Sequence, residues 1–188
     1  SLEEEIRDIL RRAEERVKEL TKENERSLRE SKKRVEDLSR ENEKTLEEIK
    51  RDVDRLLKEL KDEEEVLRLI EKMLRDARKV VEDARKLNED LLRESERVVE
   101  EVKDKNRRLL EELRRVVEEI KRLIDRGEPE DVVREMLKDL ERIVREISED
   151  NARTLEENER ILREIEEENK KTLERLREIL KRIREEVT

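Results

Sequence analysis

The chain of 188 residues has no cysteine, histidine, glutamine or aromatic residue, and only one glycine and one proline. Without cysteine there is no disulfide framework and no indication of a redox compartment. With so little glycine and proline, the turns of sheet proteins lack their usual residues, which argues against all-β and α/β folds. No apolar stretch approaches about 18 residues and no signal-peptide core is present. We therefore expect a soluble chain without a targeting signal, cytoplasmic if expressed in a bacterial host.

The missing residue types also restrict the chemistry. Nucleophilic triads, zinc sites and the Glu-x-x-His pattern of di-metal bundles need histidine or cysteine. One glycine cannot build a phosphate-binding loop, and no aromatic ring is available to stack a base or enclose a ligand. The acidic runs at 3–5, 63–65 and 166–168 fall at expected surfaces or turns, where carboxylates are solvated. We expect no enzymatic activity, no cofactor or metal, no nucleic-acid or membrane partner and no small-molecule ligand.

Charged residues make up 58 % of the chain, and they are mixed along its whole length. The net charge of −9 comes from 50 basic and 59 acidic residues, with no basic face that would indicate nucleic-acid binding. Such a charged chain could be disordered. However, its apolar residues, 31 % of the total, recur with helical periodicity, which indicates folded helices.

Two breaks divide the sequence into three helices, expected near 2–61, 63–126 and 129–188. The strong break is at Gly127 and Pro129, because glycine suits the left-handed position after a helix and proline suits the first turn of the next. The weaker break follows Lys61, where Asp62 and Glu65 have the spacing of a capping box.

Each predicted helix carries an apolar stripe with a mean spacing of about 3.6 residues, the period of a straight helix rather than of a heptad repeat. The stripe of the first helix recurs in the second after a shift of 64 residues and in the third after 127. We therefore predict an all-α fold, an elongated, nearly straight antiparallel three-helix bundle. It would resemble a coiled coil, form a single domain over residues 1–188 and assemble further.

The asparagines are the most informative residues, because all seven lie on the apolar stripes. In each helix two of them are 18 residues apart, which is about five turns and returns the side chain to the same face. A buried amide without a partner costs about 1–3 kcal/mol, so these residues need one another. Antiparallel packing would bring Asn106 to Asn151 and Asn88 to Asn169. The parallel first and third helices would align Asn24 with Asn151, Ser31 with Asn158, and Asn42 with Asn169. The predicted buried polar network is Asn24, Ser31, Asn42, Asn88, Ser95, Asn106, Asn151, Asn158 and Asn169.

With its 18-residue repeat, Asn and Ser/Thr at stripe positions and charged surfaces, the sequence resembles parametrically (de novo) designed helical bundles with buried hydrogen-bond networks. The motif Asn-x-(Arg/Lys)-(Ser/Thr)-Leu, found at Asn24, Asn42, Asn151 and Asn169, belongs to this pattern. The resemblance implies a homo-oligomer, one half of a heterodimer or a switch scaffold. The first turn departs from it by lacking glycine and proline, which leaves open a continuous helix through 61–65.

Apolar residues are shared unequally, with 16 in the first helix, 24 in the second and 19 in the third. Because contiguous apolar surface marks interfaces, the surplus predicts a further contact surface, unless the second helix is simply rotated in its packing. The candidate interface is Leu74, Val80, Leu87, Leu91, Val98, Leu109, Val116, Leu123, Ile143, Ile161 and Ile179.

Three functions are compatible with this pattern. The first is a designed self-assembling scaffold, a homo-oligomer whose partner is itself and whose polar layers set register and association specificity. The second is a binding module or heterodimer half whose open groove accepts a partner helix. The third is a monomeric designed bundle. A natural structural coiled coil is a minor alternative. We predict the first.

Overall fold

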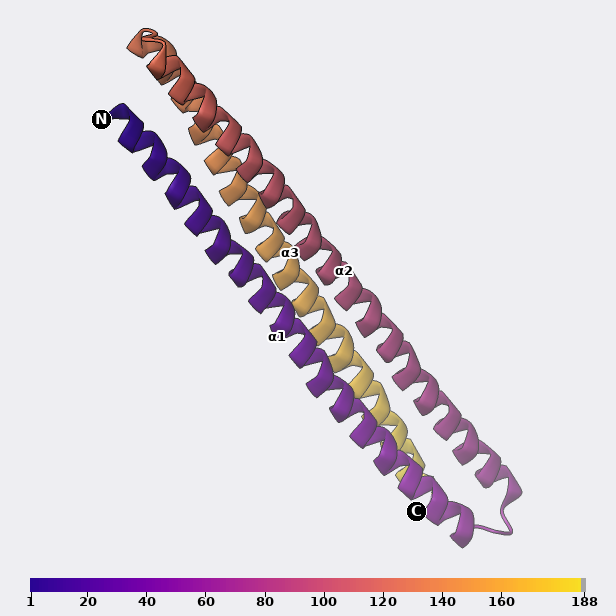
Figure 1. Ribbon diagram of the computed structural model, residues 1–188. Helices are drawn as coiled ribbons and strands as arrows, with labels where there is room; N and C mark the ends of the chain where they lie inside the picture. The colour runs from indigo at the N-terminus through magenta and orange to yellow at the C-terminus, as the bar shows by residue number, and fades with distance from the viewer. Residues whose placement is uncertain (187–188) are drawn as a thin grey trace. The chain divides into compact units, whose positions relative to one another are not determined.

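The computed structural model describes residues 1–186, which contain three α-helices and no strand (Figure 1). The helix α1 spans Leu2–Glu59, α2 spans Glu64–Asp125 and α3 spans Glu130–Glu185. The helices pack against one another as a three-helix bundle, so the predicted all-α class is confirmed. The other predicted boundaries agree within two residues, whereas the predicted end at residue 188 lies outside the described residues.

The chain divides into two compact units, each of which contains a part of all three helices. Unit 1 consists of Ser1–Arg29 and Ser95–Glu159, and unit 2 consists of Glu30–Glu94 and Arg160–Thr188. Within each unit α2 runs antiparallel to α1 and α3 (Figure 1). We expected a single domain over residues 1–188. Whether the two units form one domain depends on how they are joined, so the single domain stays a prediction.

The core of unit 1 is a continuous apolar cluster to which all three helices contribute. Most of its side chains come from the predicted stripes, because residues three and four apart share one face of a helix; Leu109 and Ile143 lie beside them. Its buried members are Ile6, Ala13, Val17, Leu20, Leu109, Leu113, Val117, Ile120, Val133, Leu140, Ile143 and Ile147.

Unit 2 has two such clusters. The larger one also draws on all three helices and contains Ile49, Val53, Leu56, Ile70, Ala77, Val81, Leu176, Leu180 and Ile183. The smaller one contains Leu38, Ile161 and Ile165, with partly buried apolar residues of α1 and α2 packed against it. In both units, burial of these stripes supplies the stabilising free energy, since apolar burial is the main favourable contribution to folding.

The turn between α2 and α3, in unit 1, has the geometry that the sequence predicted. Gly127 has a φ of 73°, the left-handed conformation. The amide of Gly127 donates to the carbonyl of Ile124, and the amide of Glu128 donates to that of Leu123. This pair of bonds is the Schellman arrangement, which satisfies the last carbonyls of α2. Pro129 then precedes the first residue of α3, and its carbonyl accepts from Val132 and Val133.

The turn between α1 and α2, in unit 2, is closed without glycine or proline. Leu60 accepts a hydrogen bond from the amide of Glu63, and the carbonyl of Glu63 accepts one from Leu67 in the first turn of α2. The chain therefore turns at residues 60–63, and no continuous helix runs through 61–65. The residue preceding the helix is Glu63, one position later than the capping-box prediction placed it, because α2 begins at Glu64.

Candidate functional site: buried asparagine triads

All nine residues of the predicted polar network are buried, with at most 3 % of their surface exposed. Six of the asparagines form two groups of three, one in each unit. Because asparagines 18 residues apart return to the same face, one helical pattern supplies both groups. We call Asn24, Asn106 and Asn151 the unit 1 triad, and Asn42, Asn88 and Asn169 the unit 2 triad.

The unit 1 triad is centred on Asn151 of α3. Its Nδ2 donates to Oδ1 of Asn106 at 2.6 Å and to the carbonyl of Ile147, one turn earlier, at 2.7 Å. Its Oδ1 accepts from Nδ2 of Asn106 at 3.1 Å and from Nδ2 of Asn24 at 3.2 Å. The amides of α2 and α3 thus exchange two bonds, and α1 adds one. The predicted pairs of Asn151 with Asn106 and with Asn24 are confirmed.

The unit 2 triad repeats this arrangement around Asn169. Nδ2 of Asn169 donates to Oδ1 of Asn88 at 2.6 Å and to the carbonyl of Ile165 at 2.7 Å. Its Oδ1 accepts from Asn88 and from Asn42, both at 3.1 Å. The predicted pairs of Asn169 with Asn88 and with Asn42 are therefore confirmed as well. In both triads the α3 residue is the hub that contacts the other two helices.

The remaining three residues of the network are less fully satisfied. In unit 1, Oγ of Ser95 donates to Oδ1 of Asn158 at 2.6 Å, while Nδ2 of Asn158 has no hydrogen-bond partner within residues 1–186. In unit 2, the hydroxyl of Ser31 likewise has no partner among the described residues. Both residues are fully buried. Such groups carry a desolvation cost of about 1–3 kcal/mol each, so these residues cost stability where the triads are largely satisfied.

Two further polar residues are buried that the predicted network did not include. Asp150 is 7 % exposed, and its carboxylate lies 2.9 Å from Nζ of Lys105 and 2.7 Å from a guanidinium nitrogen of Arg153. The sequence could have indicated this ion pair, because Lys105 and Asp150 each directly precede a triad asparagine. Thr45 is 9 % exposed, and its hydroxyl donates to the carbonyl of Glu41 in its own helix. A threonine satisfied in this way needs no partner from another helix.

Ion pairs also join the helices within each unit. In unit 1, Lys103 of α2 lies 2.9 Å from Glu25 of α1, the residue after Asn24. The hydrogen bond from Lys103, followed by its charge, lowers the pKa of Glu25, and the same bond raises the pKa of Lys103. In unit 2, Arg184 contacts Asp52 at 2.8 Å, and its pKa is raised mainly by that hydrogen bond.

The candidate interface is partly an internal surface. Leu109 and Ile143 are buried in the core of unit 1, and Ile161 is buried in unit 2, with exposures of 6 %, 0 % and 1 %. For these three residues the assignment to an outer surface was wrong. The reason is that each helix of a bundle packs against two neighbours, so positions beside the main stripe are also covered. The other eight residues are half-buried: Leu74, Val80, Leu87, Leu91, Val98, Val116, Leu123 and Ile179.

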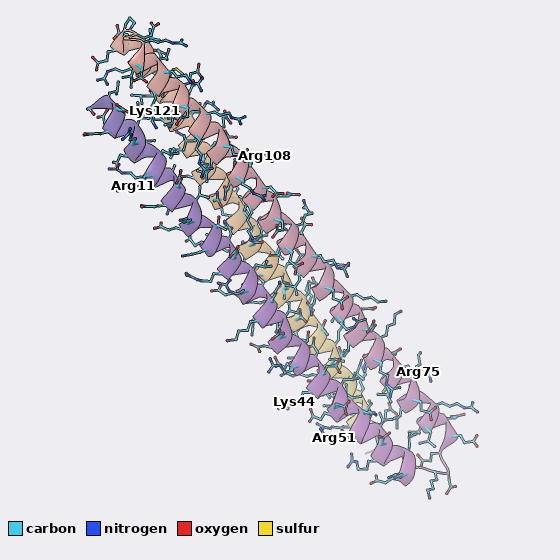
Figure 2. All side chains as sticks on the ribbon, in the orientation of Figure 1. Arg11, Lys44, Arg51, Arg75, Arg108 and Lys121 are labelled. Carbon is cyan, nitrogen blue, oxygen red and sulfur yellow. The ribbon has the colours of Figure 1, made fainter. Side chains whose placement is uncertain are left out.

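The outer surface is dominated by charged side chains. Figure 2 shows Arg11 and Arg108 of unit 1, and Arg75, Lys44 and Arg51 of unit 2, extending from the helices into solvent. Over residues 1–186, the exposed large apolar side chains are Leu69 and Val132, at 38 % and 44 %. Neither belongs to the candidate interface.

The described part of the chain lacks two other kinds of feature. It contains no group of three acidic side chains placed to hold a metal ion. None of its helices has an apolar stretch long enough to cross a membrane. Comparisons with family models, with curated proteins and with solved structures found no match to this chain.

Proposed function

We propose that this chain is a structural scaffold of designed origin, without enzymatic activity, whose buried asparagines set helix register and association specificity. The observation that carries the proposal is the repetition of one arrangement of three amides in both units. Each triad joins all three helices by side-chain hydrogen bonds at a single level. A catalytic or binding role would not need the same arrangement twice, whereas a register role is strengthened by repetition.

The physical basis is the cost of misalignment. If one helix slipped by a turn, the amides of a triad would face apolar side chains such as Leu20 or Ile147. Each unpaired amide would then cost about 1–3 kcal/mol, while apolar layers alone tolerate such slips at little cost. The triads therefore penalise wrong registers more than they stabilise the native one. A buried polar residue with this role is well attested in coiled coils.

Self-association through α2 and α3 is part of the proposal. The eight half-buried apolar residues of the candidate interface belong to these two helices, and copies of the chain would cover them in a symmetric homo-oligomer. One observation favours the alternative of a monomeric bundle. Leu109, Ile143 and Ile161, which were expected to face a second copy, complete the cores of the chain itself.

The experiment is the replacement of all six triad asparagines by leucine, followed by light scattering coupled to size exclusion. We expect the parent to have one sharp mass at an integer multiple of 23.1 kDa that is unchanged on dilution. The variant should stay helical and gain about 1–4 kcal/mol in the free energy of unfolding for each triad. Its mass distribution should broaden, because wrong registers and wrong partners are no longer penalised.

A control separates loss of the triads from loss of polar groups in general. Valine in place of Thr45 and Thr172 removes hydroxyls that bond only within their own helices, and the parent mass should be kept. A six-leucine variant with the same single sharp mass as the parent would refute the specificity role. A parent that is a clean monomer would refute self-association and leave the monomeric bundle.

A further inference from the structure

Unit 1 has a groove of about 540 Å³ between α1 and α3 that the scaffold proposal does not use. Its floor is apolar and consists of Ile9, Ala13 and Val144. Arg12, Arg16 and Arg145 line its sides, together with Glu141 and Ser148. A cavity of this volume is within the usual range for small-molecule sites, which are apolar with a few charged groups that orient the ligand.

The same seam in unit 2 shows why the groove in unit 1 is open. Residues 36 apart lie on the same face of a helix, because 36 residues make about ten turns. At the positions that correspond to Ala13 and Val144, unit 2 has the larger Ile49 and Leu180, which are 0 % and 7 % exposed, whereas the position of Ile9 has the smaller Thr45. These larger side chains fill the seam in unit 2. In unit 1 the smaller ones leave it hollow.

The two seams also differ in their charged side chains. In unit 2, Glu48 and Asp52 of α1 both pair with Arg184 of α3, at 3.4 and 2.8 Å, and these ion pairs cover the seam. At the corresponding positions unit 1 has Arg12, Arg16 and Ser148. Ser148 cannot form the ion pairs that Arg184 forms in unit 2, so the apolar floor is bordered by three arginines and one carboxylate, Glu141.

The cationic groups are available to a ligand. Arg12 and Arg16 pair only with acids of their own helix, Asp8 and Glu19, at exposed positions where such pairs contribute little. Arg145 is exposed to solvent. Guanidinium groups bind carboxylates with two parallel hydrogen bonds, so an anionic head group is the chemistry that this rim recognises.

We propose that the α1–α3 groove of unit 1 binds a single-chain anionic amphiphile, such as a fatty-acid carboxylate. The alkyl chain lies on Ile9, Ala13 and Val144, and the carboxylate is bound by the arginines. A docked helix is a poorer occupant, because three apolar side chains are too few to cover its apolar face. The sequence predicted no small-molecule ligand because aromatic residues are absent, but an alkyl chain needs apolar contact and no ring.

The test is titration of the full chain with dodecanoate, below its micelle concentration, by isothermal calorimetry. We expect saturable binding of one dodecanoate per chain. Arg12→Glu combined with Arg16→Asp copies the charges of unit 2 and should weaken binding roughly tenfold or more, by removing the carboxylate contacts. Ala13→Ile copies the filled seam and should abolish binding. Val144→Leu fills part of the same space and replaces it if Ala13→Ile does not fold.

The matched control is Arg11→Glu combined with Arg107→Glu, which changes the net charge equally at side chains that are 70 % and 69 % exposed and outside the groove. This variant should bind dodecanoate as the parent does. Non-saturable binding, equal weakening by the control, or equal affinity for dodecyltrimethylammonium would overturn the proposal. Absence of dodecanoate binding to the parent would also overturn it. If the groove variants then changed the mass in solution, a second copy of the chain would be the occupant of the groove.

Discussion

The two asparagine triads occupy separate units, and their comparison shows which part of the arrangement is constant. In both, the α3 hub exchanges two bonds with the α2 amide, with the hub's donated bond at 2.6 Å, and donates to its own helix at 2.7 Å. The α1 amide adds a single longer bond, 3.2 Å in unit 1 and 3.1 Å in unit 2. The register between α2 and α3 is therefore held more firmly than the register of α1.

The triads differ at the α1 residue. Nδ2 of Asn24 also donates to the carbonyl of Leu20, and its Oδ1 is buried without a partner within residues 1–186. The unit 2 triad is bordered by a cavity of about 270 Å³ that Asn42 and Asn169 line. The same residue type at three positions thus gives one triad with an unsatisfied buried oxygen and one triad that lines a cavity.

The largest expected effect comes from placing a charge at the hubs. Asn151→Asp puts a carboxylate where Nδ2 now donates to two oxygens, and Asn169→Asp does the same in unit 2. Each should lower the free energy of unfolding by about 3–5 kcal/mol at neutral pH, because the charge is buried and a donor is lost. Burial raises the pKa of such a carboxyl above its unfolded value. The loss of unfolding free energy is therefore complete at pH values above the raised pKa. It disappears as the pH falls towards the pKa of the carboxyl in the unfolded chain, about 3.9.

Denaturant unfolding of both variants and the parent, at about pH 7 and about pH 4, measures this effect. The two units serve as controls for each other, since their hubs have the same bonds. Losses that differ by more than about 1 kcal/mol would show that the triads are not equivalent, and a loss that grows on acidification would contradict burial of the charge.

The next effect separates two serines that are both fully buried. Ser95→Ala removes the hydroxyl that donates to Oδ1 of Asn158, so this buried oxygen loses its hydrogen bond, which should cost about 1–2 kcal/mol of stability. Ser31→Ala removes a hydroxyl that has no partner within residues 1–186, so it should be neutral or slightly stabilising. Thermal unfolding of the two variants measures the difference. Equal losses would mean that both hydroxyls are equally satisfied in solution.

Much of the fold could be predicted because the separate signals in the sequence indicate the same structure. Apolar periodicity, the Gly127–Pro129 turn and the absence of other glycine and proline all indicate three helices, and the predicted boundaries other than the end at residue 188 agree within two residues. The triads could be predicted for a geometric reason. An 18-residue spacing together with antiparallel packing leaves one level at which Asn88 and Asn169 can meet.

Features that depend on side-chain volume and rotation could not be read from the pattern. Ile143 lies beside the main stripe, and only the packing of its neighbours shows that it belongs to the core. The groove over Ala13 was missed because a small residue on the stripe does not by itself indicate a groove. The groove is recognised by comparison with unit 2, where the larger Ile49 stands at the corresponding position. The buried carboxylate of Asp150 was missed because charge was assigned to the surface, although Lys105 precedes the facing asparagine.

The smallest expected effect concerns the ion pair beside the unit 1 triad. Lys103 lowers the pKa of Glu25, so the pair stabilises the fold at pH values above the unfolded pKa of the carboxyl, and this contribution is lost as the pH falls through the folded pKa. Because the side chains are 34 % and 36 % exposed, the contribution is below about 1 kcal/mol and decreases with salt.

Glu25→Gln should therefore lower the melting temperature slightly at neutral pH and have no effect in acid below the folded pKa of Glu25. The control is Glu4→Gln, a carboxylate that is 84 % exposed and pairs only with the amino terminus. Melting curves of both variants and the parent across the acidic range measure the difference. If Glu25→Gln were as costly in acid as at neutral pH, its side chain would act through packing beside Asn24 and not through its charge.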